Sequence, residues 1–301
     1  MRVAVTGAGG RLGRALVAAL EEAPFTGPAG PIAWHRPEFD LDDPAVIHDL
    51  LDRDRPEVVV HAAAWTDVDG CTRDPELAHR RNADAVHVVA EACAARDVEL
   101  LQISTNEVFD GRRADGRGYT ADDPTSPINA YGRSKLDGEI AATAAYRGRR
   151  AGLGIVRTAW LYGPPGNDFP SKIWAAAERA VAAGEPLRVV GDEVGSPTYA
   201  PDLAEAIVEL LGADAVAGIH HLVNAGTVSR AGWARDLCAS LEVDVELEEV
   251  PASTWQRAST PPLWAVLEAT PLPSGEAMRS WQLAMRDYLP VLRRQRVAAS
   301  R

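Results

Sequence analysis

Short apolar runs alternate with longer amphipathic stretches through the first two thirds of the chain. The runs have the length of strands, and the stretches repeat their apolar positions with a helical period. The predicted strands are residues 2–6, 32–35, 57–61, 98–104, 154–158 and 187–190. The predicted helices are residues 11–22, 44–52, 75–95, 130–146 and 169–183. Since the runs are continuously apolar, they predict a parallel sheet with helices on both faces.

The last third of the chain has a different pattern. It predicts helices at residues 201–211, 229–241 and 275–288, and a strand at residues 243–250. Residues 293–301 are predicted to form a frayed end. A proline-rich passage separates the strand from the last helix. We therefore expect an α/β fold of two parts. Residues 1–165 form the larger domain, and residues 166–301 form a smaller lobe with segments that return to the first.

Composition and charge narrow the class of protein. The 301 residues are 46% hydrophobic and 25% charged, which is ordinary for a globular domain. The formal net charge is −12, so we expect no broad basic surface for nucleic acid or an anionic membrane. No apolar run approaches the ~20 residues that cross a bilayer.

Cysteine and histidine spacing bears on metal sites and on the cell compartment. The three cysteines form no CxxC pair, which argues against a disulfide framework and a zinc cluster. The seven histidines show no metal-binding spacing, so we expect no metal. Free thiols suit a reducing compartment, and the first residues read directly into a strand without a signal peptide. These features predict a cytoplasmic protein.

A glycine-rich motif, TGAGGRLG, lies between the first predicted strand and the first predicted helix. Gly7 permits a tight turn, Gly10 lets the backbone approach a pyrophosphate, and Gly13 allows close packing of the helix on the strand. Arg11 and Leu12 begin the helix, whose N-terminal N–H groups and dipole favour phosphate. This context predicts a Rossmann-type, doubly wound parallel sheet that binds a dinucleotide.

The residues after the second predicted strand bear on the choice of dinucleotide. An acidic side chain there would bind the ribose hydroxyls of NAD. The strand instead ends at Arg36, whose guanidinium suits the 2′-phosphate of NADP. We therefore expect NADPH as the cofactor, with NADH as the alternative. Asp40 and Leu41 are expected beside the adenine.

Tyr131 and Lys135 are four residues apart on a predicted helix and therefore share one face. A lysine beside a phenol stabilises phenolate and lowers the tyrosine pKa, which prepares the phenol for proton transfer near neutral pH. Only two of the 31 basic residues are lysines, and one of them stands at this position. We predict Tyr131 as an acid–base residue with Lys135 as its partner.

The glycine motif and the YxxxK pair together resemble the extended short-chain dehydrogenase/reductase family. Further stretches are similar to its dTDP-4-dehydrorhamnose reductase branch, at residues 61–69, 103–111, 157–163 and 195–200. The resemblance extends in order to about residue 212 and weakens beyond it. It implies an enzyme that transfers a hydride from NADPH to C4 of a nucleotide-linked 4-keto-6-deoxy sugar, with dTDP-4-dehydro-L-rhamnose as the first candidate.

The resemblance also implies roles for individual residues. Thr105 would hydrogen-bond the substrate carbonyl, Tyr131 would donate its proton to the C4 oxygen, and Lys135 would also hold the nicotinamide ribose. Asn82 would fix the backbone near the active site, and Lys172 would meet the diphosphate. The small residues that would line the cofactor groove are Ala62, Ala63 and Ala64. The residues that would surround the sugar are Thr66, Val68, Thr105, Asn106, Glu107 and Trp160. The expected partner is a nucleotide sugar, and the assembly considered is a homodimer.

The chain departs from this branch at two places. Asn106 and Glu107 stand where its members commonly have Asp and Tyr, and Thr260 precedes Pro261 where an arginine is common. Glu107 is similar to the glutamate of related dehydratases, whose Asp-Glu pair does acid–base work, but Asn106 cannot act as an acid. Two other functions therefore stay open: a sugar-nucleotide epimerase or dehydratase that retains NAD, and a non-catalytic regulatory subunit with the reductase fold.

Overall fold

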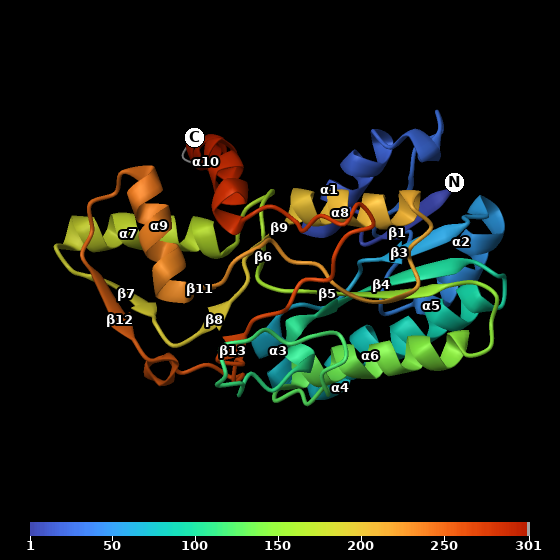
Figure 1. Ribbon diagram of the computed structural model, residues 1–301, viewed down its shortest axis with the longest axis horizontal. Coiled ribbons are helices and arrows are strands. Elements are labelled where there is room, and N and C mark those ends of the chain that lie inside the picture. Colours follow the sequence, from blue (N-terminus) through green and yellow to red (C-terminus); the bar gives the residue numbers. More distant parts are fainter. Residues whose placement is uncertain (300–301) are drawn as a thin grey trace.

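A six-stranded parallel sheet forms the centre of the larger lobe (Figure 1). The computed structural model describes residues 1–299. The strand order is β10-β5-β4-β3-β1-β2, with every neighbouring pair parallel. The strands are β1 (Val3–Thr6), β2 (Ile32–Trp34), β3 (Val58–His61), β4 (Glu99–Thr105), β5 (Leu153–Thr158) and β10 (Gly218–His221). The order changes direction between β1 and β3, and sheets of this kind bind ligands there, beyond the carboxyl ends of the strands.

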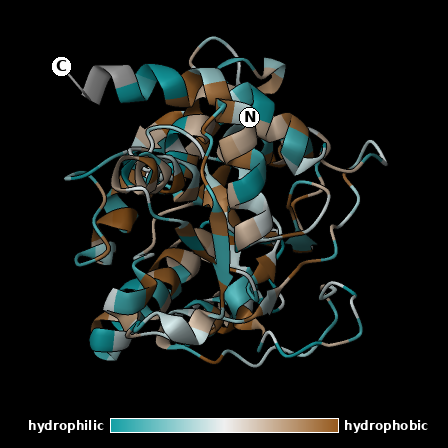
Figure 2. Ribbon diagram, turned by 90° about the vertical axis from the view of Figure 1, so that its left-hand side faces the viewer, coloured by the Kyte–Doolittle hydropathy of each residue, from teal (hydrophilic) through white to brown (hydrophobic). Residues whose placement is uncertain are grey.

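Helices cover both faces of this sheet, as the apolar strands predict. Val58 and Val60 pack with α1 (Arg11–Glu21) and α8 (Ala200–Gly212) on one face. Val59 packs on the other face with three helices: α2 (Ile47–Asp54), α5 (Ala85–Ala94) and α6 (Ala130–Tyr146). In Figure 2 the hydrophobic segments gather in the interior and the hydrophilic segments lie mainly at the periphery.

The smaller lobe packs three helices around an aromatic core. These helices are α7 (Phe169–Ala183), α9 (Arg230–Leu241) and α10 (Trp281–Ala299). Trp233 lies at the centre, where its ring stacks on Trp160 and Phe169 and meets Tyr162 edge-on. The parallel pair β7 (Leu187–Val190) and β12 (Leu247–Val250) covers the outer side of α7 and α9 (Figure 1).

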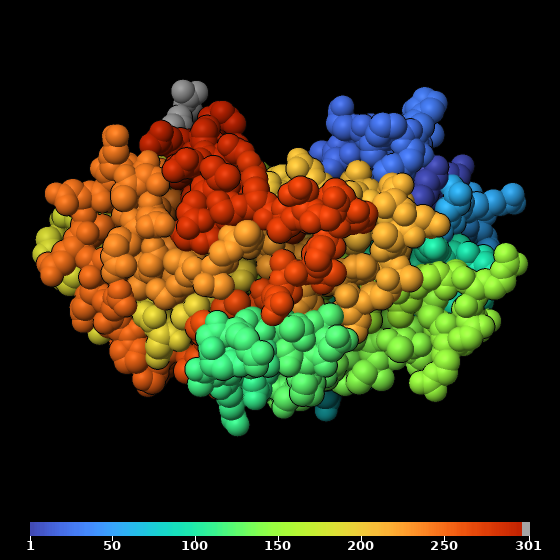
Figure 3. Space-filling view, in the orientation of Figure 1, coloured from blue at the N-terminus to red at the C-terminus, as the bar shows by residue number. Residues whose placement is uncertain are grey.

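Short strand pairs connect the two lobes. One sheet contains β11 (Val228–Ser229), β8 (Val194–Gly195) and β13 (Trp264–Ala265), and another contains β6 (Leu161–Tyr162) and β9 (Thr198–Tyr199). The chain returns to the larger lobe through α8 and β10, and again through the segment that ends in Ser280. Figure 3 shows this last segment, in orange-red, lying across the middle of the molecule. The boundary at residue 165 stays a prediction.

Several elements differ from the sequence expectation. The predicted strand at 187–190 is a strand, but it pairs with β12 in the smaller lobe and does not join the central sheet. The predicted helix at 75–95 is interrupted: α4 (Pro75–His79) and α5 flank a π-helical turn, η3 (Arg80–Asp84). This turn lies over α6, where its Asn82 carbonyl approaches Gly138 too closely for any side chain there.

Other short elements lay outside the periodic patterns. The helix α3 (Val68–Arg73) was not predicted, nor was β10, whose burial pattern is largely exposed. The last helix begins at Trp281 rather than 275 and continues through Pro290, so the frayed end expected from 293 is helical to 299; residues 300–301 lie outside the described part. The remaining short helices are η1 (Pro24–Thr26), η2 (Pro44–Val46), η4 (Asn106–Val108) and η5 (Ala252–Thr254).

No helix within residues 1–299 has both the length and the apolar character needed to cross a bilayer.

Candidate active site

The glycine motif forms a tight cradle at the carboxyl end of β1. Gly7 has φ +64°, and a Cβ there would stand 2.8 Å from the Cα of Ala63. A Cβ on Gly13 would overlap the carbonyl of Gly7, so only glycine lets α1 approach the strand this closely. Gly10 is the N-cap of α1 and makes no side-chain cap. The helix therefore presents N-terminal amide groups to a ligand, as a pyrophosphate requires.

The alanine segment is held beside this cradle by a buried polar pair. Thr6 Oγ1 accepts the N–H of Ala63 at 3.2 Å and lies 2.9 Å from Nδ1 of His61. Burial lowers the pKa of His61 to about 3, and the Lys135 charge contributes, so this imidazole stays neutral. Ala62, Ala63 and Ala64 are partly exposed next to the glycine turn, where their small side chains leave room for a ligand.

The two residues that begin α1 have side chains engaged elsewhere. Leu12 is buried in the core cluster, and Arg11 Nε donates to the carbonyl of Gly163 at 3.0 Å. Arg11 also bonds the carbonyl of Gly166. Both residues can therefore contribute to a cofactor site chiefly through their backbone N–H groups, while Arg11 ties the cradle to the loop that precedes α7.

The region after β2 contains the residues predicted to select NADP. The Arg36 side chain is 71% exposed, and its Nε lies 3.5 Å from Asp40 Oδ2. The guanidinium is therefore accessible to a phosphate. Leu41 is 5% exposed and packs in the core beside Trp34, so only its backbone is available to an adenine.

Tyr131 and Lys135 lie one turn apart on α6. Asn129 begins this helix, because its Oδ1 accepts the N–H of Gly132 at 2.8 Å. Lys135 is 3% exposed, and its Nζ donates to the carbonyl of Ile103 at 2.7 Å. Burial lowers the pKa of Lys135 to about 8, while the nearby Glu139 charge raises it.

The pKa of Tyr131 differs from the sequence expectation. Burial raises it above its ordinary value and the Glu107 charge raises it further, whereas a hydrogen bond with Thr105 lowers it. Burial and the Glu107 charge therefore outweigh the lowering expected from Lys135, and the low Tyr131 pKa predicted from the sequence is not found in this structure. The hydrogen bond with Thr105 nevertheless brings the two predicted catalytic hydroxyls together at the end of β4.

Asn82 supports this arrangement from the π-helical turn. Its Oδ1 accepts the N–H of Trp65 at 2.8 Å, and its Nδ2 donates to the Trp65 carbonyl at 3.0 Å. The same Nδ2 donates to Ser134 Oγ at 3.1 Å. Asn82 thus joins the loop after β3 to the helix that carries Tyr131.

A cavity of about 570 Å³ lies between the two lobes. It contains the sequence-predicted substrate residues Thr66, Val68, Asn106, Glu107, Trp160 and Lys172. Thr105 is 6% exposed and does not line it, but its Oγ1 accepts the N–H of Glu107 at 3.2 Å. The structure therefore brings together predicted residues from four separate segments of the first 172 positions.

The sequence reasoning missed a charged network on the opposite wall. Glu193 is 2% exposed and pairs with two arginines, with Arg230 Nε at 3.4 Å and Arg257 Nη1 at 3.0 Å. The Arg230 guanidinium lies 3.5 Å above the centre of the Trp160 ring, and burial lowers its pKa to about 10. Glu193, Arg230 and Arg257 lie outside the motifs that carry the family resemblance. The only sequence signal for this region was Thr260, which stands where an arginine is common in the reductase branch. The other lining residues are Asp67, Asp69, Asn167, Ser259, Pro261 and Pro262.

A second cavity, of about 360 Å³, adjoins the first. The two share Lys172, Arg230 and Arg257. Its other walls combine apolar and basic residues, including Phe169 and Trp255. A ligand that extends from one cavity into the other would pass three basic side chains.

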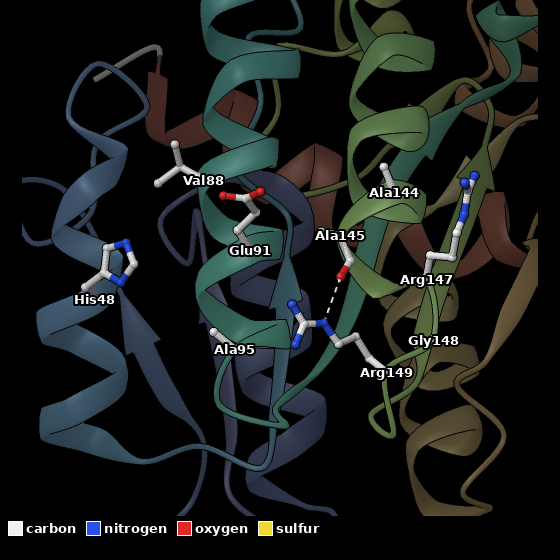
Figure 4. A pocket seen from close by; sticks show the side chains of 9 residues that line it. All are labelled: His48, Val88, Glu91, Ala95, Ala144, Ala145, Arg147, Gly148 and Arg149. Atoms are coloured by element: carbon white, nitrogen blue, oxygen red, sulfur yellow. Dashed lines mark hydrogen bonds between the residues drawn. The ribbon is translucent and has the colours of Figure 1, made fainter.

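A third cavity, of about 670 Å³, lies outside this region between α2, α5 and α6 (Figure 4). Arg149 Nε donates to the Ala145 carbonyl at 3.4 Å, and Glu91 extends from the facing helix (Figure 4). It contains none of the predicted site residues. Within the described residues, no cluster of three His, Cys, Asp or Glu side chains could hold a metal ion.

Comparison with known proteins gives consistent matches over nearly the whole chain. The family model described as RmlD substrate binding domain matches residues 1–294. A dTDP-4-dehydrorhamnose reductase of Mycolicibacterium smegmatis is 36% identical, over 95% of this chain and 84% of that protein. A dTDP-4-keto-6-deoxy-D-glucose reductase of Streptomyces niveus is 34% identical, over 96% of each chain.

A solved structure gives the corresponding match in three dimensions. The dTDP-4-dehydrorhamnose reductase of Bacillus anthracis, determined in complex with NADP, superposes with a TM-score of 0.86. It is 29% identical, and the match covers 96% of this chain and 99% of that one. The Rossmann-type fold expected from the glycine motif is therefore confirmed.

Proposed function

This chain belongs to the RmlD substrate-binding domain family, and on that premise we propose that it is an NADPH-dependent oxidoreductase that reduces C4 of a nucleotide-linked 4-keto-6-deoxy sugar. The observation that carries the proposal is the position of the Thr105–Tyr131 pair. Thr105 ends β4 at the carboxyl edge of the sheet, and the two residues after it, Asn106 and Glu107, line the 570 Å³ cavity. dTDP-4-dehydro-L-rhamnose is the first candidate substrate, since the relative from M. smegmatis is named for it.

The cradle fits the cofactor. A side chain at Gly7 or Gly13 would collide with neighbouring backbone, and the uncapped N-terminus of α1 suits phosphate. The exposed guanidinium of Arg36 would pair with a 2′-phosphate, which is consistent with NADP in the B. anthracis structure. NADPH, when bound, supplies the hydride. NADH stays the alternative because Arg36 is the one selective contact that the sequence predicted.

The proton is delivered by this chain's own side chains. Tyr131 gives its phenolic proton to the C4 oxygen as the carbonyl carbon accepts the hydride, and the resulting phenolate regains a proton from solvent. Thr105 donates a hydrogen bond to the same oxygen. Lys135, held by the Ile103 carbonyl, supplies the positive charge near the ribose.

The two adjoining cavities suit a nucleotide sugar. Thr66, Val68 and Trp160 would contact the deoxysugar in the first cavity. The three shared basic residues, Lys172, Arg230 and Arg257, would bind the diphosphate, because guanidinium groups match phosphate geometry. The base would enter the second cavity beside the aromatic rings of Phe169 and Trp255. A homodimer and a cytoplasmic location remain part of the proposal.

One experiment tests the function and the substrate together. The protein is mixed with NADPH or NADH and with either dTDP-4-dehydro-L-rhamnose or dTDP-4-keto-6-deoxy-D-glucose, the substrate named for the S. niveus relative. We expect one NADPH oxidised per sugar reduced, and identification of the product gives the configuration at C4. Conversion of sugar without net cofactor oxidation, with NAD retained on the protein, would instead show an epimerase or dehydratase. Binding without turnover would show a regulatory subunit.

A further inference from the structure

Glu193, in the wall of the first cavity, holds two arginines with one carboxylate. Its Oε1 accepts a hydrogen bond from Arg257 Nη1 at 3.0 Å, and its Oε2 accepts one from Arg230 Nε at 3.4 Å. The Glu193 side chain is 2% exposed, whereas the side chains of the two arginines are 22% and 39% exposed. A buried anion is therefore shared by two cations that a ligand can reach.

The backbone fixes Glu193 on both sides. The N–H of Arg230 donates to the Glu193 carbonyl at 3.0 Å, which joins residue 193 to the first turn of α9. The next residue, Val194, begins β8 and donates its N–H to the Leu263 carbonyl at 2.8 Å. Glu193 is therefore held where three segments of the chain meet.

Two aromatic rings hold the Arg230 guanidinium. Its central carbon lies 3.5 Å from the centre of the Trp160 ring and 5.0 Å from that of Phe169. Within residues 1–299, only its Nε has a hydrogen-bond partner, so the terminal N–H groups are available to a ligand. The Lys172 ammonium likewise has no hydrogen-bond or ion-pair partner in that range.

Three cations thus stand near one buried carboxylate where the two cavities join. Lys172, Arg230 and Arg257 line both cavities, and Glu193 offsets one of their three charges. The remaining two charges match a diphosphate that is esterified at both ends, which carries about two negative charges. A free nucleoside diphosphate carries about three at pH 8, because its terminal phosphate ionises a second time near pH 6.

The other charged groups that line the cavities add no further positive charge. In the second cavity, Arg188 pairs with Glu248 at 3.3 Å. In the first, Asp67 and Asp69 make hydrogen bonds to neighbouring protein groups. Glu107 faces the same two arginines, and burial raises its pKa. A third negative charge on a ligand therefore meets no further unpaired cation in these cavities.

We propose that Glu193 is a specificity-determining residue, whose carboxylate limits the positive charge of the arginine pair and so favours a diphosphate esterified to a sugar over the free nucleoside diphosphate. The inference rests on the proposed function, in which the same three cations bind the diphosphate of the substrate. Transfer of the sugar from a nucleotide sugar releases the free nucleoside diphosphate, which shares the base and both phosphates with the substrate. Discrimination by charge keeps this compound from occupying the site.

The test compares two ligands that differ in the terminal phosphate. Free dTDP and dTDP-glucose are titrated at pH 8 into the protein with NADPH present and without divalent cations, and the ratio of their dissociation constants is measured. Since dTDP-glucose has no keto group, the titration needs no turnover. The natural chain is compared with Glu193→Gln, with Arg257→Gln and with the variant that carries both substitutions.

We expect Glu193→Gln to shift the ratio roughly 3- to 10-fold towards free dTDP, because removal of one negative charge favours the ligand with the larger charge. Arg257→Gln should shift the ratio in the opposite direction, and the double variant should return it to the natural value. A loss of positioning alone would weaken both ligands by the same factor and leave the ratio unchanged. If Glu193→Gln folds poorly, the double variant is compared with Arg257→Gln, which isolates the same change of charge.

Glu249→Gln is the matched control, because it makes the same substitution in an exposed pair with Arg235, outside both cavities. An unchanged ratio in Glu193→Gln, or an equal shift in Glu249→Gln, would overturn the proposal. So would tighter binding of free dTDP than of dTDP-glucose by the natural chain. If the chain fails to reduce a 4-keto sugar while the ratio shifts as expected, the proposed reaction is wrong and the role of Glu193 stands.

Discussion

The cofactor half and the substrate half of the site are built in different ways. The cofactor half consists of backbone and very small side chains, and its two segments, 6–13 and 61–64, are each continuous in the sequence. The substrate half consists of large and charged side chains brought from distant segments, among them Trp160, Glu193 and Arg230. The cofactor half requires glycine at positions where a side chain would collide with neighbouring backbone. The substrate half requires a network of paired charges.

This difference affects how each half tolerates substitution. In the cradle, one added carbon collides with fixed backbone, and nothing nearby can move aside. In the cavity, Glu193 pairs with both Arg230 and Arg257, so the loss of one arginine leaves the carboxylate paired with the other. We therefore expect steep losses in the cradle, graded losses in the substrate half, and only a small loss at Arg36, which would bind the cofactor from outside the two cradle segments. Four substitutions measure this contrast.

The largest effect is expected where the two halves meet. Tyr131→Phe removes the proton donor but keeps the ring, so kcat should fall by roughly 10³-fold while NADPH binds as before. Tyr146→Phe is the matched control. Tyr146 lies on the same helix as Tyr131 but away from the cavity, and its hydroxyl donates to the Val98 carbonyl at 2.6 Å. Steady-state rates and NADPH fluorescence titration measure the two quantities. Undiminished turnover in Tyr131→Phe would remove this residue from the mechanism.

The next effect concerns the cradle alone. Gly13→Val places carbon atoms against the Gly7 carbonyl and within 2.7 Å of the Ala8 Cα, so NADPH affinity should fall roughly 10- to 100-fold. Gly9→Ala is the control from the same loop, because the nearest atom to its added carbon lies 3.8 Å away. Fluorescence titration gives both dissociation constants. Equal affinities in the two variants would contradict the steric account of the cradle.

A smaller effect is expected from the substrate half. Arg230→Leu removes one cation and leaves Glu193 paired with Arg257, so KM for the sugar nucleotide should rise roughly 10-fold at unchanged NADPH affinity. Arg235→Leu, on the same helix, removes an exposed arginine that pairs with Glu249. Its KM should match that of the natural chain. If both variants behave alike, Arg230 has no part in substrate binding.

The smallest effect is expected at Arg36. Its guanidinium is largely exposed, and exposed ion pairs contribute little, so Arg36→Ser should weaken NADPH binding by about 3- to 10-fold. NADH serves as the internal control, because it lacks the 2′-phosphate and its affinity should not change. A parallel loss for both cofactors would show that Arg36 supports the fold of this loop rather than the choice of cofactor.

The same contrast explains what the sequence could predict. The cradle, the YxxxK pair and the five main strands before residue 160 were readable because each depends on neighbours within a few positions. The pairing of Glu193 with Arg230 and Arg257 depends on segments that meet only after folding. No local pattern distinguishes those residues from solvated surface charges.

Two misjudged features have the same origin. The π-helical turn at 80–84 keeps the helical period on either side, so it reads as one helix, yet it allows Asn82 to reach both Trp65 and Ser134. The pKa of Tyr131 was expected to be lowered because Lys135 is its neighbour along the helix. In the folded protein, burial and the Glu107 carboxylate outweigh that sequence proximity.

The repeated passage of the chain between the lobes has a consequence for folding. The edge strand β10 and the covering helix α8 come from residues beyond 199, so the first 165 residues alone would leave the apolar faces of α1 and β5 without their partners. Just before the last helix, α10, begins in the smaller lobe, Ser280 pairs with Ala225, which follows strand β10 of the larger lobe. The two lobes should therefore unfold in a single cooperative transition, and a fragment cut between them should not fold alone.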